Sequence, residues 1–131
     1  MPLVARNLNT GAVIAHHVAV ALTRSARRTG LLNHRSLSEG EALWILPCRG
    51  VHTFQMRFAI DLIALDESGV IVDCVSNLKP WRVRLPRRGT SGVLELPAGW
   101  LDRTGTALGH RIEFSVHQGG APRSRVLETA A

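Results

Sequence analysis

The sequence predicts a single, mainly β (α+β) domain: a compact antiparallel or mixed, barrel-like sheet of six to eight short strands, with one helix packed against it. Three observations support this. The chain has 131 residues, which suits one hydrophobic core and is too short for two. Its apolar runs are short and are joined by hairpin-length links. Strand–helix–strand alternation is missing, which disfavours a parallel nucleotide-binding sheet.

The N-terminal part combines one clear strand with an ambiguous segment. Residues 3–8 predict a short strand before a turn. Residues 12–22 fit either a strand or a helix, because Val18, Val20 and Leu22 alternate as in a strand, whereas Ala15, Val18, Ala19 and Leu22 would form a helical stripe. We favour a strand, followed by a helix that begins at Thr23, a good N-cap residue.

Residues 53–65 carry the clearest strand pattern. Apolar side chains alternate with other residues and predict one buried face, made of Phe54, Met56, Phe58, Ile60 and Leu62. Further strands are expected at residues 41–47, 70–75, 78–85, 93–96 and 111–116, with one helical turn at 98–103. The expected domain spans residues 1–118, and residues 119–131 are expected to form a flexible tail.

The charge balance points to an anionic partner. The chain has 16 Lys and Arg against 10 Asp and Glu, a formal net charge of +6. Nucleic acid, a phosphorylated ligand or a membrane surface would each fit, but a GC-rich genome is the simpler explanation of the arginine excess, because the basic residues are spread along the chain. The loop at residues 82–88 has four arginines beside Trp81, which suits nucleic acid, although a solvated linker is the simpler interpretation.

Composition also excludes several classes of protein. With 45% hydrophobic and 20% charged residues, the chain is not disordered, and no apolar run is long enough for a membrane span. Cys48 and Cys74 are too sparse for a disulfide framework or a zinc motif, so we expect neither metal nor cofactor. Polar residues directly after Arg6 argue against a signal peptide, and a cytoplasmic location is expected.

The densest group of polar and ionisable residues follows the strand at 41–47. His52 and Thr53 lie in a predicted loop, and Arg57 and Asp61 then share one face of the predicted strand. Four residues of strand separate this pair by about 13 Å, so they would meet through a bend, a neighbour or a ligand. Because buried charges need partners, we expect the pair to line a pocket bordered by His52. A solvated strand face is the alternative.

Several motifs in chain order resemble a known family: the bacterial and archaeal domain of unknown function numbered 192, also called uncharacterised protein family 0127. They are Gly30-Leu31-Leu32, Glu39-Gly40-Glu41-Ala42-Leu43, His52-Thr53-Phe54-x-Met56-Arg57-Phe58-x-Ile60-Asp61, Asp66-x-x-Gly69 and Val93-Leu94-Glu95-Leu96-x-x-Gly99. The resemblance implies a compact, mainly β domain without an established reaction, and it supports a site at His52, Met56, Arg57 and Asp61. Ala59 and His110 depart from the family pattern, so no metal or acid role is carried over.

These observations favour a non-catalytic binding domain with a pocket for a small polar or anionic ligand. The expected ligand-binding residues are His52, Thr53, Met56, Arg57, Asp61 and Glu95. A small hydrolase-like enzyme is one alternative, with His52 as general base and Asp61 as its orienting carboxylate. Nucleic-acid binding through residues 82–88 is another. The enzyme alternative is the weaker one, because no nucleophile motif accompanies the histidine, but the sequence does not decide the question.

Overall fold

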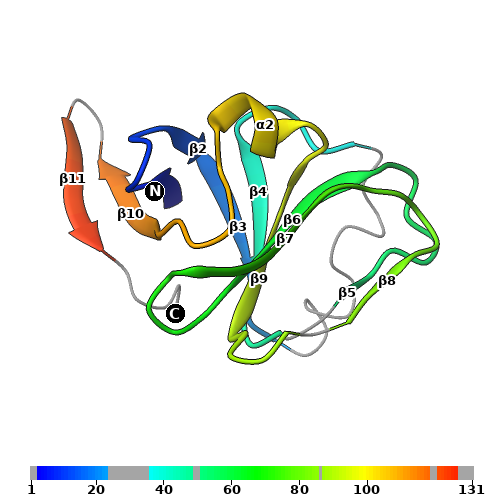
Figure 1. Cartoon of the computed structure of the whole chain (residues 1–131). Helices are drawn as coiled ribbons and strands as arrows, with labels where there is room; N and C mark the ends of the chain where they lie inside the picture. Colours follow the sequence, from blue (N-terminus) through cyan, green and yellow to red (C-terminus); the bar gives the residue numbers. More distant parts are fainter. Residues whose placement is uncertain (1–2, 24–35, 49–50, 86, 119–120, 127–131) are drawn as a thin grey trace.

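The computed structural model of the protein describes residues 3–23, 36–48, 51–85, 87–118 and 121–126 (Figure 1). These residues form eleven strands and one helix. In chain order the strands are β1 (Leu3–Asn7), β2 (Val13–Ala15), β3 (His17–Ala21), β4 (Glu41–Ile45), β5 (Val51–His52), β6 (Ile60–Leu65), β7 (Ile71–Leu78), β8 (Val83–Arg84), β9 (Gly92–Pro97), β10 (Ile112–Gln118) and β11 (Ala121–Val126), and the helix is α2 (Trp100–Thr104).

The strands form three sheets. The first has the order β11-β10-β1-β2, the second β3-β4-β9-β6-β7, and the third pairs β5 with β8. Neighbouring strands are antiparallel except β3 and β4, which are parallel. The mainly β class with a short helix is therefore confirmed, but the strands of the described residues do not close into a barrel. Closure would need a continuous ladder of paired strands, whereas here β3 and β7 remain edges of the five-stranded sheet.

The five-stranded sheet has a hydrophobic cluster on each face. Leu94 and Leu96 of the central strand β9 belong to the first cluster, together with residues of β1, β2 and β10. Val93 belongs to the second, which is covered by Val51 and Met56. Every residue of β6 and β9 is buried as a result.

One close contact in this sheet depends on a glycine. A Cβ atom at Gly92 would lie 2.6 Å from Cη2 of Trp44, on the neighbouring strand. The missing side chain therefore makes room for the buried indole, whose ring centroid lies 5.0 Å from that of Phe114 in β10.

The strand predicted over residues 53–65 is shorter in the structure. Only Ile60–Leu65 is a strand, and the preceding residues turn, with Gln55 in the left-handed region at φ 66°. Ile60, Leu62 and Met56 are buried as expected, but Phe54 is 40% exposed. The expected inner face is therefore wrong at Phe54 and only partly right at Phe58, which is half-buried.

Other boundaries follow from local chemistry. Residues 12–22 form the two strands β2 and β3, which confirms the favoured interpretation, whereas the helix expected from Thr23 falls largely outside the described residues. The helical turn expected near residue 100 is α2, which begins after Gly99 at φ 88°. Residues 121–126 form the edge strand β11 rather than a free tail, because backbone pairing with β10 tolerates a proline at an edge.

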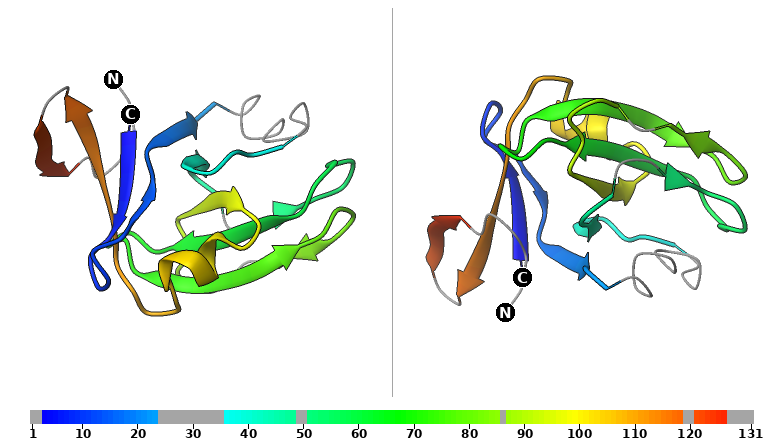
Figure 2. Two further views of the ribbon diagram at one scale, coloured as in Figure 1. Left: turned by 90° about the horizontal axis from the view of Figure 1, so that it is seen from above. Right: turned by 90° about the horizontal axis from the view of Figure 1, so that it is seen from below.

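The third sheet lies at one end of the molecule. β5 and β8 lie side by side, far from β10 and β11, in the front view and in the views from above and below (Figures 1 and 2). His52 pairs with Val83 and Val51 with Arg84. Since paired residues share a face, Val51 and Arg84 point toward the second cluster while His52 and Val83 point away from it.

Candidate functional site

Asp61 is fully buried at the start of β6, where it holds backbone amides. Its Oδ1 accepts hydrogen bonds from the amides of Asn77, at 2.8 Å, and Gly99, at 3.1 Å. Its Oδ2 accepts from the amide of Leu101 at 2.8 Å. The carboxylate therefore ties β7 and the first turn of α2 to β6. An anion is favourable at this position, because the first amides of a helix have no acceptor within the helix.

A direct contact of Arg57 with Asp61 is not found among the described residues. Asp61 uses both carboxylate oxygens on backbone amides, and Arg57 is an exposed residue of the turns before β6. His52 is also exposed, and its aromatic contact is with Phe54. The parity argument failed because the chain from Thr53 to Ala59 is not a strand, so alternation does not place its side chains.

Glu95 is buried at the centre of the sheet, on the face opposite to Asp61. It pairs with Leu62 across β6 and β9, whereas Asp61 pairs with Leu96. Its Oε2 has no hydrogen-bond partner among the described residues, and burial raises the pKa of this carboxyl to about 7. The six expected site residues therefore do not share one concavity, because the two carboxylates point to opposite faces.

Thr53 is fully buried and ties two segments together. Its Oγ1 donates to the Lys79 carbonyl at 2.6 Å and accepts from the Arg82 amide at 2.9 Å. Its own amide donates to the Arg82 carbonyl at 2.8 Å, and its carbonyl accepts from the Trp81 amide at 3.0 Å. These bonds hold the turn after β5 against the loop between β7 and β8.

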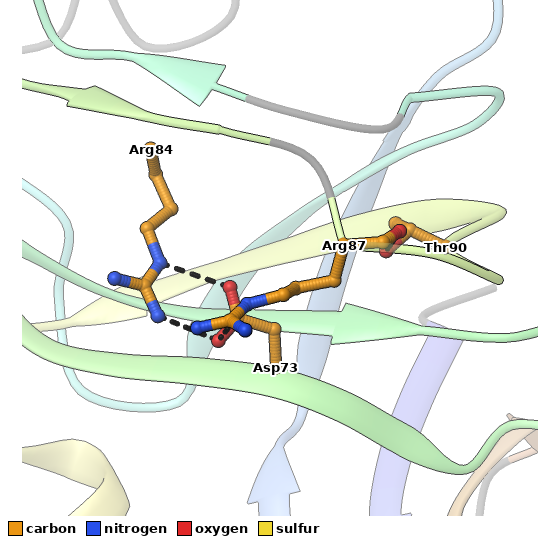
Figure 3. Close-up of polar contacts among 4 residues, drawn as sticks. All are labelled: Asp73, Arg84, Arg87 and Thr90. Atoms are coloured by element: carbon orange, nitrogen blue, oxygen red, sulfur yellow. Dashed lines mark hydrogen bonds and ion pairs between the residues drawn. The ribbon is translucent and has the colours of Figure 1, made fainter.

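Beside this frame, two arginines converge on a third buried carboxylate (Figure 3). Asp73 of β7 accepts from Nε of Arg84 at 2.9 Å and from Nη2 of Arg84 at 2.6 Å. Nε of Arg87 lies 3.7 Å from Oδ1 of the same aspartate. The paired Arg84 guanidinium lowers the pKa of Asp73, and the aspartate in turn raises the pKa of Arg84.

The position of Arg87 is set by its own turn. Its carbonyl accepts from the amide of Thr90 at 3.1 Å and from the Thr90 hydroxyl at 2.7 Å. An open depression of about 450 Å³ lies here, lined by Val83, Arg84, Leu85 and Arg87. Two guanidinium groups against one carboxylate leave an excess positive charge at its wall. The arrangement suits an anion that accepts hydrogen bonds from fixed arginine groups.

An exposed aromatic row runs along the same end of the molecule. The His52 and Phe54 ring centroids are 5.0 Å apart, and those of Phe54 and Trp81 are 5.9 Å apart with planes inclined by 28°. Trp81 is 61% exposed. Its backbone lies in the left-handed region at φ 66°, which is strained for a bulky residue. The main chain that carries this ring is held by the carbonyl of Thr53.

Sequence reasoning singled out the Arg-rich loop for its composition but missed the contact of this loop with Asp73. Asp73 was one polar residue in an apolar strand, and no spacing rule connects it with Arg84 eleven positions later. The sequence did contain a signal for such a partner, since a lone aspartate in a buried strand requires a nearby cation or hydrogen-bond donors. The aromatic row was missed because Phe54 was assigned to the core.

Other site types receive no support from the described residues. They contain no group of three or more His, Cys, Asp or Glu side chains placed to hold a metal ion. Cys48 and Cys74 are not joined to each other by a disulfide, and both pack partly against the hydrophobic clusters. None of the helices in the described part of the chain has the length and apolar character that a membrane crossing requires.

Comparison with known proteins places the chain in a family. A model of the family DUF192, described as "Uncharacterized ACR, COG1430", matches residues 5–114. The chain belongs to this family. A UPF0127 protein of Thermococcus sibiricus is 30% identical over 117 residues, covering 86% of this chain and 75% of that relative. A UPF0127 protein of Pyrococcus furiosus is 37% identical over 65 residues, covering 50% of this chain and 55% of that relative. The resemblance seen in the sequence is confirmed.

Solved structures share the fold of this DUF192 domain. A protein of unknown function from Novosphingobium aromaticivorans superposes with a TM-score of 0.73 at 22% identity, covering 86% of this chain and 84% of that one. A protein from Sinorhizobium meliloti described as a "putative transcription regulator" gives a TM-score of 0.73 at 21% identity, covering 86% of this chain and 91% of that one. At these identities the likeness concerns the fold alone.

Proposed function

We propose that this DUF192 domain is a non-catalytic binding module for a polar, anionic ligand, and that the ligand lies over Arg84 and Arg87. The observation that carries the proposal is the bidentate hydrogen bonding of Arg84 to Asp73. It lies beside Arg87, at the wall of an open depression. A guanidinium oriented in advance loses little conformational freedom when it binds a phosphate or carboxylate.

The contact geometry leaves binding capacity for such a ligand. Asp73 engages Nε and Nη2 of Arg84 and does not engage Nη1. The Arg87 side chain is 61% exposed. Both groups retain donors that an incoming oxyanion accepts from. The enzyme alternative is weaker, because Asp61 does not orient His52: its oxygens are bound to the amides around α2.

The test is calorimetric titration with inorganic pyrophosphate at low salt, in wild type, Arg87→Gln and a matched control, Arg111→Gln. Arg111 is an exposed arginine that precedes β10, away from β8. We expect Arg87→Gln to weaken binding about tenfold, the loss of one charge-assisted contact, with the control unchanged. Equal affinities in the two variants, or no binding by wild type, would contradict the proposal.

A further inference from the structure

The positive charge of the protein is concentrated at the end that carries β5 and β8. Residues 42–60 and 74–94 contain seven of the 16 Lys and Arg residues and none of the 10 Asp and Glu residues. The rest of the chain has nine bases against ten acids, so these two segments account for the whole net charge of +6. Since β5 and β8 pair, the two segments meet in space.

The aromatic row (His52, Phe54 and Trp81) lies within these two segments. Its flanking cations form what we call the arginine edge, consisting of Arg82, Arg84, Arg87 and Arg88. Val83 connects the two features, because it pairs with His52 across the strands and also lines the depression beside Arg84. The aromatic row and the arginine edge therefore belong to the same two-stranded ribbon and meet at its rim, with His52 and Val83 on one face and Arg84 on the other.

The main chain beneath this exposed surface is held by hydrogen bonds to Thr53. The peptide amide of Trp81 and the main chain of Arg82 are held by Thr53, which has no exposed surface. A large ring exposed to water at a strained backbone position brings little to stability, because its burial is slight. Strain of this kind is retained where the surrounding structure imposes it, and it clusters at binding sites.

We propose that the aromatic row and the arginine edge together bind single-stranded nucleic acid, with bases stacked on Trp81 and Phe54 and backbone phosphates on the arginine edge. The proposal rests on the anion binding proposed above and names its ligand class. Stacking platforms beside cationic tracks are the arrangement used for unpaired strands, because every base has a π face. A small free anion would use the arginines and leave the rings without a role.

An unpaired strand fits better than a duplex. Base faces in a duplex are stacked on one another and are not available to Phe54 and Trp81. The phosphates of either form suit the arginine edge, since neither segment contains an acidic residue and Asp73, which borders them, is already paired with Arg84. The bases therefore give affinity beyond that of the phosphates.

The experiment compares two fluorescently labelled probes by anisotropy at low salt: an oligothymidylate of about 12 nucleotides and a strand of the same length that lacks bases. The variants are Trp81→Ala, Phe54→Ala and a control, Leu108→Ala, which removes another apolar side chain of similar exposure (63%). The frame survives the first change because Thr53 binds Trp81 through its main chain.

Stacking of a single base already predicts that wild type prefers the oligothymidylate by about 5- to 150-fold. Trp81→Ala should abolish most of this preference and leave the affinity for the abasic strand unchanged, and Leu108→Ala should change neither. Equal binding of the two probes by wild type, with both weakened by Arg87→Gln, would overturn the nucleic-acid inference and leave the anion site standing. If wild type bound neither of the two strands nor pyrophosphate, both the nucleic-acid inference and the anion site would be overturned.

Discussion

Asp61 and Asp73 are buried aspartates on the neighbouring strands β6 and β7, and their carboxylates accept hydrogen bonds from different kinds of donor. Asp61 accepts hydrogen bonds from three backbone amides that belong to β7, the residue before α2 and α2 itself. Asp73 accepts from the side chain of Arg84, and Arg87 lies beside it. The first carboxylate is enclosed by main-chain amides, whereas the second contacts arginine side chains that are partly exposed to solvent.

The difference separates stability from binding. A carboxylate bound to main-chain amides fixes the path of the chain and leaves no donor for a ligand. A carboxylate bound to partly exposed arginines orients groups that have further donors to offer. The region around Asp61 therefore supports the fold, while the end of the molecule around Asp73, β5 and β8 is the place where we expect a ligand. Removing groups from the two regions should affect different measurements.

The largest expected effect is on stability at Asp61. Asp61→Ala leaves amides of Asn77, Gly99 and Leu101 without their acceptor and should lower the free energy of unfolding by about 4 kcal/mol, measured by urea denaturation. Asp102→Ala, an exposed carboxylate of α2, is the control and should change it by about 0.5 kcal/mol or less. Arg57→Met should be similarly mild, and a loss at Arg57 comparable with that at Asp61 would indicate that the two side chains are partners in solution.

The next effect concerns Glu95 and depends on pH. Burial raises its pKa from 4.5 to about 7, so the folded state holds the proton more tightly than the unfolded state. Stability should therefore fall as the pH rises from about 4.5 to 7, and the penalty should be complete above 7. Glu95→Gln removes the titration, so its stability relative to wild type should rise by about 3 kcal/mol between pH 4 and pH 8.

Urea melts of wild type, Glu95→Gln and Glu67→Gln at these two pH values check this. Glu67 is exposed in the turn between β6 and β7, so its substitution should leave the pH profile unchanged. A parallel profile for wild type and Glu95→Gln would mean that the carboxylate is ionised throughout and has partners in solution.

The smallest effect tests the strain at Trp81. Trp81→Ala and Trp81→Gly both remove the ring, but only alanine keeps a Cβ atom at φ 66°. The glycine variant should therefore be more stable by about 1 kcal/mol in thermal or urea unfolding. The same pair of substitutions at Val83, whose backbone is a regular strand, should favour alanine instead. If alanine were the more stable residue at both positions, the left-handed conformation would be absent in solution.

The fold was largely readable from the sequence, but the site was readable only in part. Period-2 patterning correctly predicts β6 and the burial of Ile60 and Leu62, and the strands β2 and β3 confirm the prediction for residues 12–22. Patterning failed from Thr53 to Ala59, where apolar residues alternate without forming a strand. Thr53 imposes turns there through hydrogen bonds to residues 26 to 29 positions away, and no local rule reports such contacts.

Buried charges were predicted to need partners, and Asp61 and Asp73 have them. The identity of the partners was beyond the sequence, because it depends on which loops the strand order brings together. Asp61 receives amides from β7 and the start of α2, which lie 16 to 40 positions away. Asp73 receives arginines from the loop that had been singled out for its composition alone. The strand order that creates both contacts follows from the packing of the whole chain.

The most direct test of the central claim is amide chemical-shift mapping by two-dimensional NMR during titration with the 12-nucleotide oligothymidylate. Binding at the end that carries β5 and β8 predicts progressive shifts at His52, Phe54, Trp81 and Arg84, with little change at the amides that Asp61 holds, Leu101 above all. Shifts concentrated around Leu101 and Asp61, with Trp81 and Arg84 unmoved, would contradict the division of the molecule into a structural and a binding region.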